Sequence, residues 1–332
     1  TLNMTTQASS VTFNATDAVD LDMIVATATD GFGTLNFIDT ADATAIANTL
    51  SGGDIGASEL RIGTINIGSA TKGGRLTTIN DDAIFAAAIN ITGGNVDAED
   101  SVLALHENIG DADSSVAMVL TDLAGDAELL IGTASTVFGT IDGTAGAAGA
   151  GTSIIDVDTA LIVTDSIGGN NAVELLQIGD TTTLKGAANT ITSTAFTADD
   201  ILNIGITANG VAQNIDSVIT TGNETGTINI VNASNAVTFE KGIGVTAARV
   251  KMLQIADNAT TRFKSSVFAL NLDVNTAAAA DVTTWSTGNV IGDSGATSGA
   301  MNIAGGTFVL DTGVIAGTTV FNTVEVANND AG

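Results

Sequence analysis

The pentapeptide "GTINI" occurs twice in this chain, at Gly63–Ile67 and again at Gly226–Ile230. Its core is a single Asn between two apolar residues. Side chains alternate between the two faces of a β-strand, so the apolar pair lies on one face and the Asn on the other. The pentapeptide therefore predicts a half-buried strand with an aliphatic inner face and an amide on its outer face.

The same apolar–Asn–apolar triplet recurs along the chain, which indicates a repeating structural unit. Five of the seven intervals between successive triplet Asn residues are 24 to 33 residues long. A ligand-binding motif would not need so many copies, whereas a stack of similar rungs would. The Asn residues of these triplets are Asn3, Asn36, Asn66, Asn90, Asn203, Asn229, Asn271 and Asn302.

The composition favours a β-rich fold with a narrow aliphatic core. The 332 residues contain 38 Gly, no Pro and only 4% aromatic residues, although 44% are hydrophobic. The lack of Pro fits strands in which every backbone N–H is needed for pairing. We therefore predict an all-β fold, a parallel β-solenoid with irregular loops. Antiparallel β-sandwich domains would show the same alternation and are the alternative.

The sequence predicts one elongated β-rich domain over residues 1–332. The stretch "GTAGAAGAGTS" at 143–153 has low complexity and no strand character, so we expect a hinge or a flexible loop there. Two other stretches, Asp81–Ile89 and Asp113–Leu130, contain good helix formers and fit either short helices or strands.

The formal net charge of −28 excludes some classes of partner. Nucleic acid requires Lys and Arg against its phosphates, and an anionic membrane surface would repel this chain. The sequence has no run of 18 apolar residues, so no membrane insertion is expected. The charge favours divalent cations or a hydrated cell surface.

The acidic residues concentrate in one region, which is a candidate calcium site. Nine acidic residues and no basic residue lie between Asp97 and Glu128. Calcium takes six to eight oxygen ligands, and acidic loops supply them. No EF-hand or similar spaced motif is present, so a solvated acidic surface is the simpler alternative. The candidate ligands are Asp97, Glu99, Asp100, Asp111 and Asp113.

Five of the nine basic residues fall in one short stretch. Such a patch could meet the acidic surface of another copy of the chain, and we predict an assembly patch here. The alternative is a solvated face without a partner. The residues of this basic stretch are Lys241, Arg249, Lys251, Arg262 and Lys264.

We predict no catalytic site and no required cofactor, with calcium as the one ion under consideration. The absence of Cys excludes disulfides and thiol catalysis. His106 is the only His, and no Gly-x-Ser-x-Gly motif accompanies it, so a catalytic triad is not expected.

The Gly-Thr-[Ile/Leu]-Asn strands, the stretch "NAVTFEKGIG" at Asn235–Gly244 and the Cys-free acidic composition resemble prokaryotic surface proteins. The likenesses are the β-solenoid passenger regions of autotransporters and the crystalline surface-layer proteins. The resemblance covers most of the chain but is one of style and composition. It implies extracellular exposure at the cell surface, a structural or adhesive role and calcium-dependent assembly. The Gly-Gly-x-Gly-x-Asp calcium nonapeptides of some surface layers are missing, which weakens the implied role of calcium.

The expected function is therefore that of a noncatalytic extracellular structural protein. It would be a self-assembling subunit of a surface layer or filament, or a passenger-type surface segment, and its partner would be itself. One alternative is an adhesin that binds a cell-surface ligand such as a glycan. A β-helix polysaccharide lyase, with a base drawn from the basic stretch, is the enzymatic alternative.

Overall fold

The computed structural model describes residues 2–15, 19–21, 25–39, 47–51, 53–79, 83–96, 99–144, 151–205, 211–231, 235–245, 247–256, 260–274, 282–285, 300–303, 307–310 and 323–326. All regular secondary structure in these residues is β-strand. The chain divides into two compact units, Thr1–Leu176 (unit 1) and Gln177–Gly332 (unit 2).

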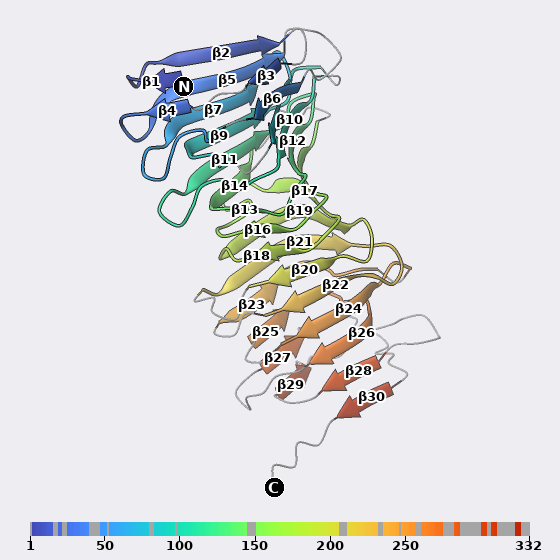
Figure 1. Ribbon diagram of the computed structural model, residues 1–332. Coiled ribbons are helices and arrows are strands. Elements are labelled where there is room, and N and C mark those ends of the chain that lie inside the picture. The colour runs from blue at the N-terminus through green and yellow to red at the C-terminus, as the bar shows by residue number, and fades with distance from the viewer. Residues whose placement is uncertain are drawn as a thin grey trace. The chain divides into compact units, whose positions relative to one another are not determined.

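Unit 1 is a stack of parallel rungs that form two main sheets (Figure 1). The first sheet contains β2 (Ser10–Ala15), β5 (Phe32–Asp39), β7 (Ile62–Gly68), β9 (Ala86–Thr92), β11 (Val116–Thr121) and β14 (Gly139–Gly143). The second contains β3 (Val19–Leu21), β6 (Ala47–Ser51), β8 (Gly74–Ile79), β10 (Ser101–Leu105), β12 (Ala127–Ile131) and β15 (Ser153–Val157).

A third side of unit 1 is built from shorter pairings. Single parallel bridges join Ile55 to Ile84, Ile84 to Ile109 and Ile109 to Val137. Two short strand pairs lie outside these two sheets, and a last strand contains the boundary between the units. These strands are β1 (Leu2–Met4) with β4 (Val25–Thr27), β13 (Ser135–Val137) with β16 (Leu161–Val163), and β17 (Val173–Ile178).

Unit 2 repeats the same arrangement. One sheet contains β18 (Thr182–Leu184), β20 (Ile201–Ile204), β22 (Thr225–Ile230), β24 (Val250–Ile255), β26 (Ala269–Val274), β28 (Ala300–Ile303) and β30 (Thr323–Val326). The other contains β19 (Ala188–Phe196), β21 (Gln213–Thr220), β23 (Ala236–Phe239), β25 (Thr260–Phe263), β27 (Val282–Trp285) and β29 (Thr307–Leu310).

The prediction of an all-β parallel solenoid is confirmed. Within each unit, strand neighbours in a sheet come from successive rungs and run parallel, whereas a sandwich would pair them antiparallel. Both stretches that fitted either helix or strand contain strands, β9 in the first and β11 and β12 in the second. The predicted single domain stays a prediction, and residues 145–150 of the predicted hinge lie outside the described residues.

The core is a set of aliphatic columns that run along the stack. The inward residues Ile65 and Ile67 of β7 align with Leu35 and Phe37 of β5, and all four are at most 1% exposed. Among the described residues, each unit also contains a stacked aromatic pair between neighbouring rungs. The ring centroids of Phe13 and Phe37 in unit 1 lie 5.0 Å apart, and those of Phe239 and Phe263 in unit 2 lie 5.1 Å apart.

Candidate functional site

The triplet Asn residues of unit 1 form an amide ladder on the outer face of the first sheet. Asn36, Asn66 and Asn90 occupy the same register position in β5, β7 and β9. Asn66 Nδ2 donates to Asn36 Oδ1 at 2.8 Å, and Asn90 Nδ2 donates to Asn66 Oδ1 at 2.8 Å. Asn36 continues the ladder by donating to Thr12 Oγ1 at 3.2 Å. The repeated amide therefore bonds one rung to the next.

Unit 2 contains a second, shorter ladder. Asn229 Nδ2 donates to Asn203 Oδ1 at 3.1 Å, and Asn203 Nδ2 donates to Thr183 Oγ1 at 3.3 Å. In the following rungs, Gln254 and Asp273 occupy the same register position. The ladder is thus a column of polar side chains in which Asn is the commonest member.

Carboxylates at the rung corners bond the rungs in a second way, which sequence reasoning missed. Asp100 Oδ1 accepts the backbone N–H of Asp126 at 2.9 Å, and Asp126 Oδ1 accepts that of Thr152 at 2.7 Å. On another corner, Asp54 Oδ1 accepts the N–H of Ala83 at 2.8 Å. Each carboxylate satisfies a donor of the next rung, so part of the large negative charge has a structural role.

An Arg–carboxylate clasp on unit 1 joins rungs that lie further apart. The Arg61 guanidinium binds both carboxylate oxygens of Asp30, with Nε–Oδ1 and Nη2–Oδ2 distances of 3.0 and 2.8 Å. Its Nη1 donates to the carbonyl of Ser115 at 2.8 Å. The hydrogen bond from Arg61 lowers the pKa of Asp30. Fork geometry of this kind fixes the side chains more firmly than a single contact.

The predicted calcium ligands are mostly engaged with protein groups. Glu99 is buried and forms an ion pair with Lys72, with Nζ and Oε1 3.0 Å apart. Asp111 accepts a hydrogen bond from Ser58, which lowers its pKa, and accepts the N–H of Asp113 at 2.9 Å.

The corner bond of Asp100 is described above, and Asp97 lies outside the described residues. Among the residues that the structure describes, no three acidic or His side chains converge closely enough to hold a metal ion. A calcium ion on the five predicted ligands stays a prediction.

Most side chains of the basic stretch form ion pairs within unit 2. Lys264 Nζ lies 2.7 Å from Glu240 Oε1, and Lys241 Nζ lies 3.3 Å from Asp216 Oδ1. Ion pairs also join Arg249 to Glu224 and Lys251 to Asp199. Arg262 is exposed on β25. Four of the five predicted assembly residues therefore hold carboxylates of their own unit, and an intermolecular role for the stretch stays a prediction.

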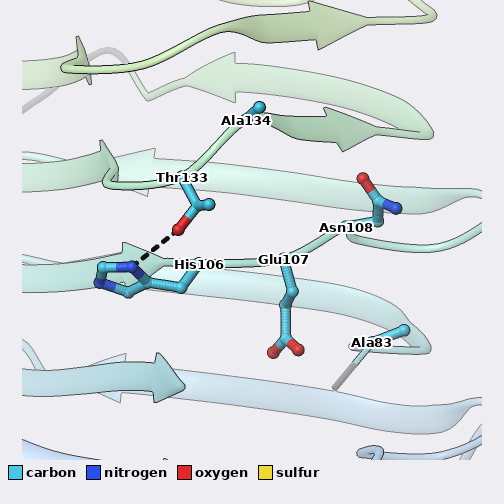
Figure 2. Close-up of a pocket in the computed structure, with 6 residues that line it drawn as sticks. All are labelled: Ala83, His106, Glu107, Asn108, Thr133 and Ala134. Carbon is cyan, nitrogen blue, oxygen red and sulfur yellow. Dashed lines mark hydrogen bonds between the residues drawn. The ribbon is translucent and has the colours of Figure 1, made fainter. Parts of the chain in front are cut away.

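A shallow hollow of about 210 Å³ lies beside His106 in unit 1 (Figure 2). His106 Nδ1 and Thr133 Oγ1 are 2.9 Å apart, and the ring points toward the hydroxyl in Figure 2. Asn108, which also lines the hollow, uses Oδ1 to accept the N–H of Thr136 at 2.7 Å. The imidazole packs on Gly132, where an added Cβ would lie 2.6 Å from its Cε1 atom. The contacts of His106 and Asn108 thus join neighbouring rungs at this corner.

Four further carboxylates of unit 1 form a group with raised pKa values. Burial raises the pKa of Glu128, and the charge of Asp156 raises it further. Burial and the charge of Asp158 raise the pKa of Asp156. Burial and the charges of Asp122 and Asp126 raise that of Glu174, while burial raises the pKa of Asp122. Burial is thus the largest cause of the raised pKa in all four carboxylates, and the charge of a neighbouring carboxylate adds to it in three of them.

Comparisons with protein families, with curated proteins and with solved structures found no match to this chain. The described residues contain no helix that could span a membrane.

Proposed function

We propose that the chain is a noncatalytic structural protein of the cell surface that assembles with copies of itself. The proposal rests on the polar side chains along the stack, which form hydrogen bonds from one rung to the next. The amides of Asn36, Asn66 and Asn90 bond rung to rung, as do the corner carboxylates Asp100 and Asp126. A binding or catalytic protein would be expected to direct such groups into one cavity instead.

Assembly of this kind is favoured by the fold itself. Each rung of a parallel solenoid offers backbone N–H and C=O groups to the next rung, and stability sums over such nearest-neighbour interfaces. The edge of any sheet can pair with another chain in the same way unless it is covered. In a layer or filament, the pairing that joins rungs within each unit would continue from one chain to the next.

Because of the net charge of −28, the association of copies would depend on the salt concentration. Like-charged copies repel over about 10 Å at 0.1 M salt and over longer distances at lower salt. We therefore expect assembly to be weak in dilute buffer and to increase with ionic strength or with divalent cations.

Negative-stain electron microscopy and sedimentation velocity test the proposal. The chain is compared at 10 mM and 500 mM NaCl and at 5 mM CaCl₂ with and without chelator. Ordered layers or filaments that increase with salt or calcium are the expected result. Discrete monomers under every condition would refute assembly and favour an adhesin that binds its ligand as a monomer.

A further inference from the structure

The outer face of the first sheet in unit 1 is free of charge across four neighbouring strands. Its outward positions are alternate residues of Thr34–Ile38, Thr64–Gly68, Ala88–Thr92 and Ala117–Thr121, which belong to β5, β7, β9 and β11. Within these described ranges the outward residues are Thr, Asn, Ile, Ala, Val and Gly, and none is charged. We call this surface the neutral face, and its four strands lie side by side in Figure 1.

The other outer sheet faces of the described chain contain charged residues. The second sheet of unit 1 has Arg75, Glu128 and Asp156 at outward positions of β8, β12 and β15. In unit 2, Asp216 lies on the outer face of β21 and Asp273 on that of β26. Because the chain carries a net charge of −28, another copy of it would meet the least repulsion at the neutral face.

The neutral face is open to solvent and can still form hydrogen bonds. Ala117 is exposed, and Thr64 and Ala88 are partly exposed. Asn66 uses one N–H and one oxygen lone pair in the ladder, through its bonds to Asn36 and Asn90. A side-chain amide has two N–H donors and two lone pairs, so the ladder leaves amide donors and acceptors for a partner.

Contact between oppositely charged patches is a weaker explanation for how copies meet. Four of the five residues of the basic stretch already form ion pairs with carboxylates of unit 2. The cores of protein–protein interfaces are also depleted in charged residues. The neutral face has this property, whereas the other outer faces do not.

We propose that two copies of this chain pack against each other through their neutral faces. The inference rests on the proposed function and specifies the surface by which copies meet. The contact would be isologous, with the same patch contributed by both copies. Edge pairing of strands would join copies along the stack, and the neutral face would join them sideways, so the two contacts together can build a layer.

The size of the face predicts a weak contact. Strands lie about 4.8 Å apart and rise about 3.3 Å per residue, so four strands of about six residues present about 400 Å². Two faces would bury about 800 Å² in total, which is less than most stable complexes bury. The contact therefore gains its effect by repetition, when each copy is also held by its other contacts.

Sedimentation velocity tests the contact under the conditions in which the unaltered chain assembles most. The variants are Ala88→Glu, which places a charge on the neutral face, and Ala88→Gln, which adds the same bulk without charge. Val218→Glu is the control for net charge, because Val218 is 42% exposed on β21 of unit 2. The chain has no Cys, so Ala117→Cys and Val218→Cys each add a single thiol for cross-linking by a bismaleimide, a readout that adds no charge.

We expect Ala88→Glu to associate at least about tenfold more weakly than the unaltered chain, because like charges opposed across an interface are strongly unfavourable. Ala88→Gln and Val218→Glu should assemble like the unaltered chain, and Ala117→Cys should form cross-linked dimers more readily than Val218→Cys.

Two results would overturn the contact while the proposed function stands. One is equal assembly of the unaltered chain, Ala88→Glu and Val218→Glu, or equal weakening of both Glu variants. The other is cross-linking of Val218→Cys as readily as Ala117→Cys. Monomers of the unaltered chain under every condition would instead refute the proposed function, and the contact with it.

Discussion

Replacing Asn66 with Ala should destabilise unit 1 by more than the loss of one exposed amide would suggest. Asn66 is the middle member of the ladder and makes two side-chain hydrogen bonds, each 2.8 Å long. A typical hydrogen bond contributes about 0.5–1.5 kcal/mol, so two contribute about 1–3 kcal/mol. Because Asn66 is half-buried, water can satisfy part of what its neighbours lose. We therefore expect a loss of about 1–2 kcal/mol.

Urea unfolding followed by circular dichroism measures this loss, and Asn3→Ala is the control. Asn3 sits in the same kind of triplet but is exposed on β1, opposite Ala26 and outside the ladder. Its replacement should cost less than about 0.5 kcal/mol. The double variant Asn36→Ala/Asn66→Ala should cost less than the sum of the two single changes, because both remove the same bond. Equal losses for Asn66→Ala and Asn3→Ala would show that the ladder contributes nothing.

Three further predictions concern packing and charge. Phe263→Ala should cost about 3–5 kcal/mol in urea unfolding, because the ring is fully buried and stacks on Phe239. Gly93→Ala should cost about 1–3 kcal/mol, since an added Cβ would lie 1.9 Å from the Gly125 carbonyl oxygen. Gly169→Ala, where the nearest atom is 3.4 Å away, should be close to neutral by the same measurement. Asp156→Asn should raise Tm at pH 7, because the charged carboxylate has a raised pKa and therefore opposes folding. Its advantage should shrink as pH falls through the raised pKa and vanish below 3.8, the ordinary value, so a gain independent of pH would contradict this reasoning.

The inner face of the strands could be predicted from the sequence because alternation fixes it. Ile65 and Ile67 are buried and Asn66 lies on the opposite face, as the pentapeptide required. The same reasoning held for Ile228 and Ile230 in the second copy. Period-2 patterning distinguishes the two faces of a strand, and each rung repeats the distinction.

The register could be predicted only in part, because alternation is unchanged by a shift of two residues. The triplet Leu270-Asn271-Leu272 looks like a ladder member, yet Leu272 aligns with Leu253, and Asp273 aligns with Gln254. Asn271 therefore lies two residues away from the ladder position. Asn302 aligns with Asp273 and does occupy that position. The triplet identifies an outward residue in a strand, whereas the neighbouring rung decides which outward residue joins the column.

The acidic and basic clusters were harder to interpret because clustering along the sequence says little about neighbours in a solenoid. Asp111 bonds to Asp113 in its own turn but also to Ser58 of an earlier rung, and Asp100 bonds to Asp126, 26 residues later. A residue at a rung corner meets its equivalents in the rungs before and after. Partners at a corner are therefore separated by about one rung along the chain. A search for ligands that are close together in the sequence does not find them.

The same one-rung separation is visible in the positions of the charged residues along the sequence. The partners Glu224 and Arg249 are 25 residues apart, and Glu240 and Lys264 are 24 apart. These separations fall within the range of the Asn intervals, which was the evidence for a rung. Carboxylates one rung before a basic residue thus predict ion pairs within the stack. They account for three of the four ion pairs of the basic stretch, whereas the partner of Lys251, Asp199, lies 52 residues earlier.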